Sequence, residues 1–227
     1  DGAPPDWREI VAVFAVKTAG TNDGVDVVTL DADRVARLKE VFWEMTSLSS
    51  AVETIDHPDS DPDDGEDDSW TETILTISII ETACQLVGKV NYFWGGKSLV
   101  LGWDSRWGTT MQVTAPGSST TGTYRPYGMD CSGYVDWVFY NATGAEYIIG
   151  HGGGASAQHS YCTAISWDEA MPGDLVFYPE DSHVGIVGGR DESGNLLIIH
   201  CASGYNNVVI TGIEGFTSIG RPVYFSD

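Results

Sequence analysis

The sequence is poor in basic residues: 11 lysines and arginines stand against 33 aspartates and glutamates, giving a formal net charge of −22. Nucleic acids and anionic membrane surfaces are bound through basic side chains that replace counterions, so this balance argues against both as partners. No apolar run approaches the length of a membrane span, and we expect no membrane insertion. The start, Asp1-Gly2-Ala3-Pro4-Pro5, lacks the charged and apolar regions of an export signal.

Cysteine is also scarce. The four cysteines, Cys84, Cys131, Cys162 and Cys201, are too few and too irregular for a disulfide framework or a CxxC zinc site. The pattern fits free buried thiols, or one bridge plus free thiols, and both interpretations stay open. Because 42% of the 227 residues are hydrophobic and eight are tryptophans, the chain can build a core without such staples.

Residues 1–72 are predicted to form a helical accessory region that ends in an acidic linker. Apolar residues recur at helical spacing from Trp7 to Val16 and from Val35 to Met45, which predicts two amphipathic helices, the second capped by Asp31. Residues 40–88 contain no lysine or arginine, and acidic side chains crowd about 53–72, as in an exposed linker. A calcium loop at Asp59, Asp61 and Asp63 is the alternative, but an EF-hand's glycine and terminal glutamate are not at the required offsets.

Residues 73–129 lead from this region to the centre of the sequence. The β-branched stretch 73–80 predicts either a strand or the start of a helix that continues to Val87 and ends at Gly88. In Tyr92-Phe93-Trp94-Gly95-Gly96, the paired glycines predict a sharp bend or a close approach to a ligand. Residues 97–129 are rich in glycine, threonine, serine and tryptophan without a regular period, so this long connection is either functional or ordered on its own.

The centre of the sequence is the stretch 127–140, around Asp130-Cys131-Ser132-Gly133. The next apolar residues keep helical spacing and predict a helix that begins at Cys131: Tyr134, Val135, Val138 and Phe139. Asp130 is a residue type that caps helices, and Gly144 marks the end. Because a helix N-terminus favours an anion, we expect the Cys131 thiol to be a thiolate of lowered pKa.

The residues after this helix predict an antiparallel sheet. Strands are expected at 175–178, 183–187, 196–200, 208–210 and 223–225, with a turn over 188–195 and a flexible glycine-rich loop over 150–154. A helix followed by an antiparallel sheet is an α+β fold.

Two of these strands carry histidines. If Val187 pairs with Leu196, the same antiparallel register places His183 opposite His200. Directly opposed residues lie about 5 Å apart at Cβ, close enough for one imidazole to orient the other. A thiol at a helix start, a histidine and a second polar ring are the parts of an activated-cysteine site, in which sulfur attacks a carbonyl and His183 transfers the proton.

The successive motifs of the chain resemble those of the NlpC/P60 family of papain-like cell-wall peptidases. These motifs are 92–96 (YFWGG), 130–133 (DCSG), 172–177 (PGDLVF), 183–187 (HVGIV) and the pair 199–200 (IH). The resemblance spans roughly residue 79 to the C-terminus, and we expect the peptidase domain over 73–227. The segment 97–129 is longer than the family's usual connector, and the N-terminal region does not resemble its SH3-like or LysM modules.

The resemblance implies a papain-like α+β fold, no cofactor or metal, and hydrolysis of the γ-D-glutamyl bond to the diamino acid of peptidoglycan stem peptides. It implies that Cys131 is the nucleophile, His183 the general base and His200 the residue that orients His183. Tyr92 is expected to hold the oxyanion beside the backbone N–H of Cys131.

The resemblance also implies a substrate cleft. Asp130, Ser132 and Trp94 are expected to line it, with Asp130 receiving a stem-peptide amine. Because peptidoglycan lies outside the cytoplasmic membrane, we expect an extracellular or wall-associated bacterial protein, although this chain carries no export signal.

Three other functions are compatible with parts of the sequence. The first is an N-acetylmuramoyl-L-alanine amidase, or another γ-glutamyl amidase, with the same thiol chemistry. The second is a non-catalytic wall-binding or partner-binding module, in which the acidic segment 53–72 contacts a basic partner. The third is a zinc site at His159, Cys162, His200 and Cys201, which is disfavoured because neighbouring residues of a strand point to opposite faces.

Overall fold

The computed structural model describes residues 21–22, 25–26, 68–146, 149–191 and 193–225. The two predicted N-terminal helices, the calcium-loop alternative and the linker up to residue 67 lie outside the described residues. Within the N-terminal region, β1 (Thr21–Asn22) pairs with β2 (Val25–Asp26) in an antiparallel ladder. None of the described helices combines the length and the hydropathy that a bilayer span requires.

Helix α3 (Asp68–Gln85) is the first long described element. Residues 73–80, for which the sequence allowed a strand or a helix, are helical. The helix begins at Asp68, inside the segment predicted as linker. Ile77, Ile80 and Ala83 are buried at a spacing of three, so core packing outweighs the modest helix propensity of its β-branched residues. The helix packs on α4, where the Tyr134 hydroxyl donates to the Ala83 carbonyl at 2.9 Å.

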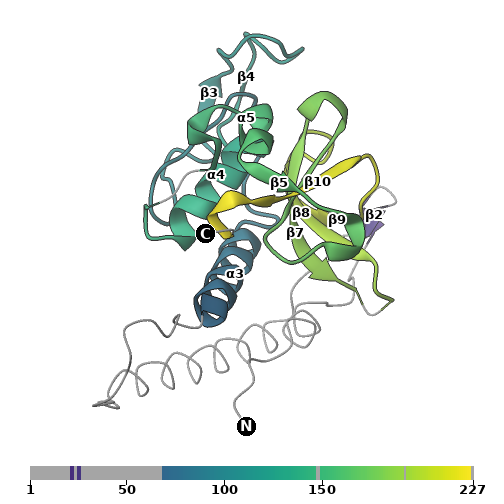
Figure 1. The fold of residues 1–227 in the computed structure, drawn as a ribbon. Helices are drawn as coiled ribbons and strands as arrows, with labels where there is room; N and C mark the ends of the chain where they lie inside the picture. The colour runs from purple at the N-terminus through teal and green to yellow at the C-terminus, as the bar shows by residue number, and fades with distance from the viewer. Residues whose placement is uncertain (1–20, 23–24, 27–67, 147–148, 192, 226–227) are drawn as a thin grey trace, which may run out of the picture.

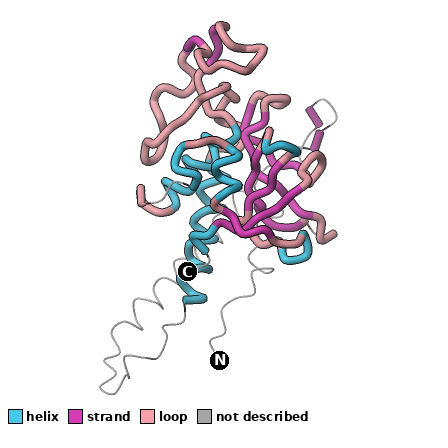
Figure 2. The backbone as a smooth tube through the Cα atoms, turned by 45° about the horizontal axis from the view of Figure 1, so that its top comes forward, coloured by secondary structure: helices cyan, strands magenta, loops and turns pink. Residues whose placement is uncertain are grey.

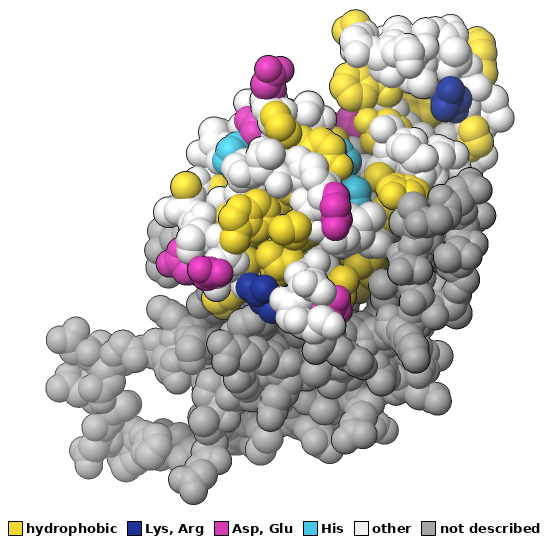
Figure 3. All heavy atoms as spheres, turned by 90° about the vertical axis from the view of Figure 1, so that its right-hand side faces the viewer, with side chains coloured by type: hydrophobic (Ala, Val, Ile, Leu, Met, Phe, Trp, Pro, Cys, Tyr) yellow, Lys and Arg dark blue, Asp and Glu magenta, His cyan; other side chains and the backbone are white. Residues whose placement is uncertain are grey.

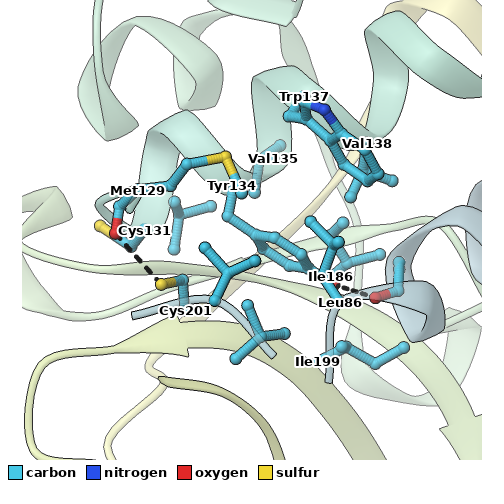
Figure 4. Packing of buried hydrophobic residues seen from close by; sticks show 14 of the residues in the cluster. Leu86, Met129, Cys131, Tyr134, Val135, Trp137, Val138, Ile186, Ile199 and Cys201 are labelled. Atoms are coloured by element: carbon cyan, nitrogen blue, oxygen red, sulfur yellow. Dashed lines mark hydrogen bonds between the residues drawn. The ribbon is translucent and has the colours of Figure 1, made fainter. Parts of the chain in front are cut away.

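Helix α4 (Cys131–Ala142) confirms the helix predicted at Cys131. Asp130 is its N-cap, because the carboxylate accepts the N–H of Gly133 at 2.7 Å, and Gly144 follows the end with φ +63°. Every residue from Cys131 to Phe139 is buried. Figure 4 shows this helix above the core, where the Cys201 thiol donates to the Met129 carbonyl at 3.2 Å.

A six-stranded antiparallel sheet forms the other half, in the order β5-β10-β6-β7-β8-β9. The strands are β5 (Cys162–Ala164), β6 (Leu175–Phe177), β7 (Val184–Arg190), β8 (Leu196–Ala202), β9 (Asn207–Thr211) and β10 (Ser218–Pro222). Helices α3 and α4 lie to one side of the sheet (Figures 1 and 2). The predicted strand 223–225 is wrong: these residues form the 3₁₀ helix η4 (Val223–Phe225) after β10, which pairs with β5 and β6.

The predicted histidine register is also wrong. Ile186 pairs with Ile199 and Val187 with Ile198, which places Gly185 rather than His183 opposite His200. A β-bulge at Gly188 shifts the ladder, and the strand continues to Arg190, so the turn begins at Asp191 instead of residue 188. The Asp191 carboxylate accepts the N–H groups of Ser193 and Asn195, which fixes this later turn.

Short helices fill the connection between α4 and β6. They are η1 (Ile149–Gly152), α5 (Ala155–Ser160) and η2 (Trp167–Glu169), with η3 (Pro179–Asp181) after β6. The stretch 150–154, predicted as a flexible loop, is therefore one turn of 3₁₀ helix that leads into α5 through Gly154. In α5, Gln158 is fully buried and donates to the Ser132 carbonyl at 2.8 Å, which ties the segment to the start of α4.

Residues 97–129, here called the arm, project from the body of the molecule (Figures 1 and 2). The arm contains the hairpin β3 (Thr110–Gln112) and β4 (Tyr124–Pro126) and is otherwise built of turns. Trp107 and Tyr127 are buried at its base, whereas Leu101, Trp103 and Tyr124 are 58%, 56% and 69% exposed. The segment predicted without a regular period is thus ordered on its own.

Candidate active site

The Cys131 thiol lies where the start of α4 meets the start of β7. The backbone N–H groups of Ser132 and Val184, one from the helix and one from the strand, lie near enough to the sulfur to favour its thiolate form. Val184 directly follows His183, so this contact brings the predicted nucleophile beside the backbone of the predicted base. Figure 3 shows histidine side chains where the lobe that holds the arm meets the rest of the surface.

Burial outweighs the helix N-terminus in setting the protonation of this pair. It raises the pKa of Cys131 to about 11, with the Asp130 carboxylate as the second cause, although the two N–H groups and Lys97 oppose the rise. Burial also lowers the pKa of His183 to about 4. The prediction of a resting thiolate is therefore wrong: at neutral pH the free protein holds Cys131 as a thiol and His183 as a neutral imidazole.

The two histidines meet diagonally across the β7–β8 ladder. Nε2 of His183 lies 2.6 Å from Nδ1 of His200, so the predicted contact between the rings exists although the register is different. Gly185 makes this possible: a Cβ there would lie 2.6 Å from Ile198 Cγ2 and 3.2 Å from the Cβ of His200. Phe216 packs against both rings, with centroid distances of 5.9 and 5.5 Å.

His200 continues the contact to a residue that the sequence analysis missed. Its Nε2 lies 3.0 Å from the hydroxyl oxygen of Thr211, the last residue of β9. Burial, and then the neighbouring His183, lower the pKa of His200 to about 3, so this ring is also neutral at physiological pH. Thr211 lies two residues beyond Val209, the residue that pairs with His200. Because alternate residues of a strand point to the same face, this spacing was the one sequence signal for Thr211.

A cluster of charged groups also lies near the thiol. The Asp130 carboxylate accepts the N–H of Gly95 at 3.1 Å, the hydroxyl of Ser132 at 3.0 Å and the ammonium of Lys97 at 3.3 Å, besides its cap bond. Lys97 was not predicted; its Nζ also lies 2.6 Å from Ser132 Oγ and 3.7 Å from Asp136. Asp136 is buried beneath, and this burial raises its pKa to about 6.

The two predicted aromatic site residues lie in different surroundings. Tyr92 forms an isolated β-bridge with Met129, and burial followed by the nearby Cys131 raises the pKa of its phenol, which keeps it a hydrogen-bond donor. Trp94 lies under the arm, because its indole N–H donates to the Pro116 carbonyl at 2.9 Å.

The zinc alternative is not supported among the described residues, where no three potential ligands gather. Cys162 lies on β5, at the opposite edge region of the sheet from His200 on β8. His159 contacts the Asp181 carboxylate at 2.7 Å instead. All four cysteines are free, which decides the question that the sequence left open.

Comparisons with known proteins agree on one family. The NlpC/P60 family model matches residues 89–217. "Probable endopeptidase p60" of Listeria grayi is 40% identical over 74 residues, and this match spans only 14% of the length of that relative and 31% of this chain.

Solved structures of the family are similar to this chain at low sequence identity. The peptidoglycan hydrolase RipB of Mycobacterium tuberculosis aligns with a TM-score of 0.49 and 20% identity, over 84% of this chain and 85% of its own. RipD of the same organism, described as a non-catalytic NlpC/p60 domain protein, aligns with a TM-score of 0.46 and 18% identity, over 65% and 96%.

The matched range covers more than half of the 227 residues and contains Cys131, His183 and His200. The architecture also agrees with the expected α+β fold, in which a helix that begins at a cysteine packs on an antiparallel sheet. The chain therefore belongs to the NlpC/P60 family, which includes peptidoglycan hydrolases.

Proposed function

We propose that the protein is a cysteine peptidase that hydrolyses peptidoglycan stem peptides at the bond between D-glutamate and the diamino acid. The observation that carries this proposal is the set around the thiol: Cys131 beside the backbone of Val184 at the start of β7, His183 directly before Val184, and His200 in contact with His183. These are the residue types of a nucleophile, a base and an orienting group.

In the first step, the thiol is the proton source. His183 accepts the Cys131 proton as the sulfur attacks the carbonyl carbon, because the high thiol pKa and low imidazole pKa leave no standing ion pair. The negative charge moves to the carbonyl oxygen, where the Tyr92 phenol and the backbone N–H of Cys131 stabilise it. His183 then gives the proton to the departing amine, and a thioester remains on Cys131.

In the second step, the thioester is hydrolysed. A water molecule gives one proton to His183 and attacks the acyl carbon, and the C–S bond breaks. The sulfur takes the proton back from His183, which restores the thiol and the neutral imidazole. The products are a peptide that ends in D-glutamate and a peptide that begins with the diamino acid.

Asp130 and Ser132 are proposed to face the substrate cleft, with Trp94 at the arm. Their chemistry suits an amine, since they already hold the Lys97 ammonium. A stem-peptide amine must therefore displace Lys97. Lys97→Met is expected to lower KM for a tripeptide with a free amine but not for the N-acetylated form of that tripeptide. If the ratio of these two KM values is the same in the variant and the wild type, this role is contradicted.

The proposed substrate implies that the protein acts outside the cytoplasmic membrane, in contact with the bacterial cell wall. No metal or cofactor takes part in the proposed steps.

Mass spectrometry of purified muropeptides incubated with the wild type and with Cys131→Ala tests the proposal. We expect release of fragments beginning with the diamino acid by the wild type and a loss of at least about 10³-fold in the variant. Release at the muramoyl–L-alanine bond would assign the amidase activity instead. Binding without release by either protein would assign a non-catalytic role.

A further inference from the structure

Three hydrogen bonds lead away from His183 in one line. They join Nε2 of His183 to Nδ1 of His200 at 2.6 Å, Nε2 of His200 to Thr211 Oγ1 at 3.0 Å, and Thr211 Oγ1 to the Gly212 carbonyl at 3.0 Å. The first two contacts involve ring nitrogens that can either donate or accept. The last does not have this freedom, because a carbonyl oxygen only accepts.

The Gly212 carbonyl therefore determines which atom donates and which accepts in each of the three hydrogen bonds. The single hydroxyl proton of Thr211 is donated to Gly212, so Thr211 Oγ1 accepts from His200 and His200 carries its proton on Nε2. Nδ1 of the neutral His200 is then bare and accepts from His183 Nε2–H. Nδ1 of His183 is left without a proton, as a base that removes the Cys131 proton must be.

We propose that Thr211 is a positioning residue that fixes the tautomers of both histidines and so keeps His183 Nδ1 a proton acceptor. The proposal rests on the proposed function insofar as Cys131 and His183 are the reacting pair. The opposite direction, with Thr211 donating to His200, would put a proton on His183 Nδ1 and leave the thiol without a base.

The surroundings make this ordering effective. His200 is 3% exposed, and Phe216 packs against its ring in an edge-to-face contact, so a solvent molecule does not readily replace Thr211 as the partner of Nε2. When His183 becomes an imidazolium during the reaction, its Nε2–H still donates to His200, and the line needs no rearrangement.

Two variants of Thr211 separate the hydroxyl from the side-chain volume. Thr211→Val keeps the shape and removes the hydroxyl, whereas Thr211→Ser keeps the hydroxyl. Thr163→Val, an exposed position of β5 in the same sheet, is the matched control. The readouts are kcat and KM for muropeptide cleavage, and ¹⁵N NMR of labelled histidine, which reports the protonated nitrogen of each ring.

We expect both wild-type rings to be protonated on Nε2. Thr211→Val should lower kcat about tenfold with KM unchanged, a part of the roughly 10²–10⁴-fold that a positioned base contributes, and should give a tautomer mixture at His200. Thr211→Ser should keep the wild-type kcat and spectrum, and Thr163→Val should change neither.

The proposal is overturned if wild-type His183 carries its proton on Nδ1 or if Thr211→Val retains the wild-type kcat. It is also overturned if Thr163→Val lowers kcat as much as Thr211→Val does. Should the wild type cleave no muropeptide, the proposed function fails, and the NMR spectra still decide the tautomers.

Discussion

Two sets of side chains near the Cys131 thiol, here called the sheet side and the arm side, differ in how they are held together. On the sheet side, His183, His200 and Thr211 are neutral groups joined by directional hydrogen bonds. On the arm side, Lys97, Asp130 and Asp136 are ions or ionisable groups around Ser132. Burial lowers the histidine pKa values on one side and raises the pKa of Asp136 on the other, because in each case it disfavours the charged form.

This difference teaches what each side contributes. Neutral rings in a fixed tautomer determine where a proton can go, and they require exact placement by packing. The charged cluster tolerates more variation, since Lys97 is 36% exposed and water screens its pairs. We therefore expect changes on the sheet side to have larger effects than changes on the arm side.

Gly185→Ala should give the largest effect on stability. Its new Cβ would lie 2.6 Å from Ile198 Cγ2 on the neighbouring strand, and relief requires movement of β7 against β8. Over-packing of this kind costs about 3 kcal/mol, and the displaced His200 should also reduce turnover. Chemical denaturation measures the free energy of unfolding. Gly204→Ala, where a new Cβ has no neighbour within 4 Å, is the control; equal losses would contradict the argument.

Acidification should lower the contribution of the sheet side to the free energy of unfolding and raise that of the arm side. The unfolded chain protonates its histidines near pH 6.5, whereas folded His183 and His200 do so near pH 4 and 3, so their stability contribution is complete above pH 6.5 and declines below it. From pH 7 to pH 5 this loss is about 2 kcal/mol for each histidine. On acidification, folded Asp136 binds its proton near pH 6, at a higher pH than an unfolded aspartate does, so its protonation favours the folded state. This offsets about 1 kcal/mol of the stability that the histidines lose between pH 7 and pH 5.

Denaturation of the wild type, His200→Gln and Asp136→Asn at pH 7 and pH 5 checks both signs. His200→Gln should lose less stability than the wild type between these pH values, and Asp136→Asn should lose more. Parallel pH dependences in all three proteins would show that burial does not determine these pKa values.

Asp130→Asn should have the smallest of the three effects. The amide oxygen still caps α4 by accepting the Gly133 N–H, and what is lost is the acceptor of the Gly95 N–H and the charge opposite Lys97, which is 36% exposed. We expect a cost of about 1 kcal/mol in thermal or chemical denaturation. Asp168→Asn, at an exposed site, should cost less than about 0.5 kcal/mol. A loss as large as that of Gly185→Ala would remove the contrast between the two sides.

Local signals in the sequence predicted the centre of the site well. The cap residue Asp130, the helical spacing after Cys131 and the stop at Gly144 lie within a few turns of one another, and the structure confirms all three. The glycine-rich and histidine motifs likewise identified the family that the comparisons show.

Features that depend on distant partners were not predictable in the same way. The alternation of side chains along a strand does not reveal a bulge. The bulge at Gly188 and the later turn at Asp191 therefore gave the histidine strands a register that differs from the predicted one. Lys97 and Thr211 acquire their roles from partners 33 and 11 residues away. The thiolate prediction considered the helix end but not the burial of Cys131, which a linear pattern does not give.

The base of the arm has a consequence for how the length of this chain can vary. The Asp130 N–H donates to the Gly96 carbonyl at 3.1 Å and the Gly95 N–H donates to the Asp130 carboxylate at 3.1 Å, so hydrogen bonds close the 97–129 excursion next to the nucleophile. Within it, the Val113 N–H and the Thr123 carbonyl close the hairpin again at 2.9 Å. Because the entropy of closing a loop grows only slowly with its length, residues gained or lost at the exposed tip leave both closures in place. The arm is thus a point where insertions can accumulate while Cys131 stays where the chemistry needs it.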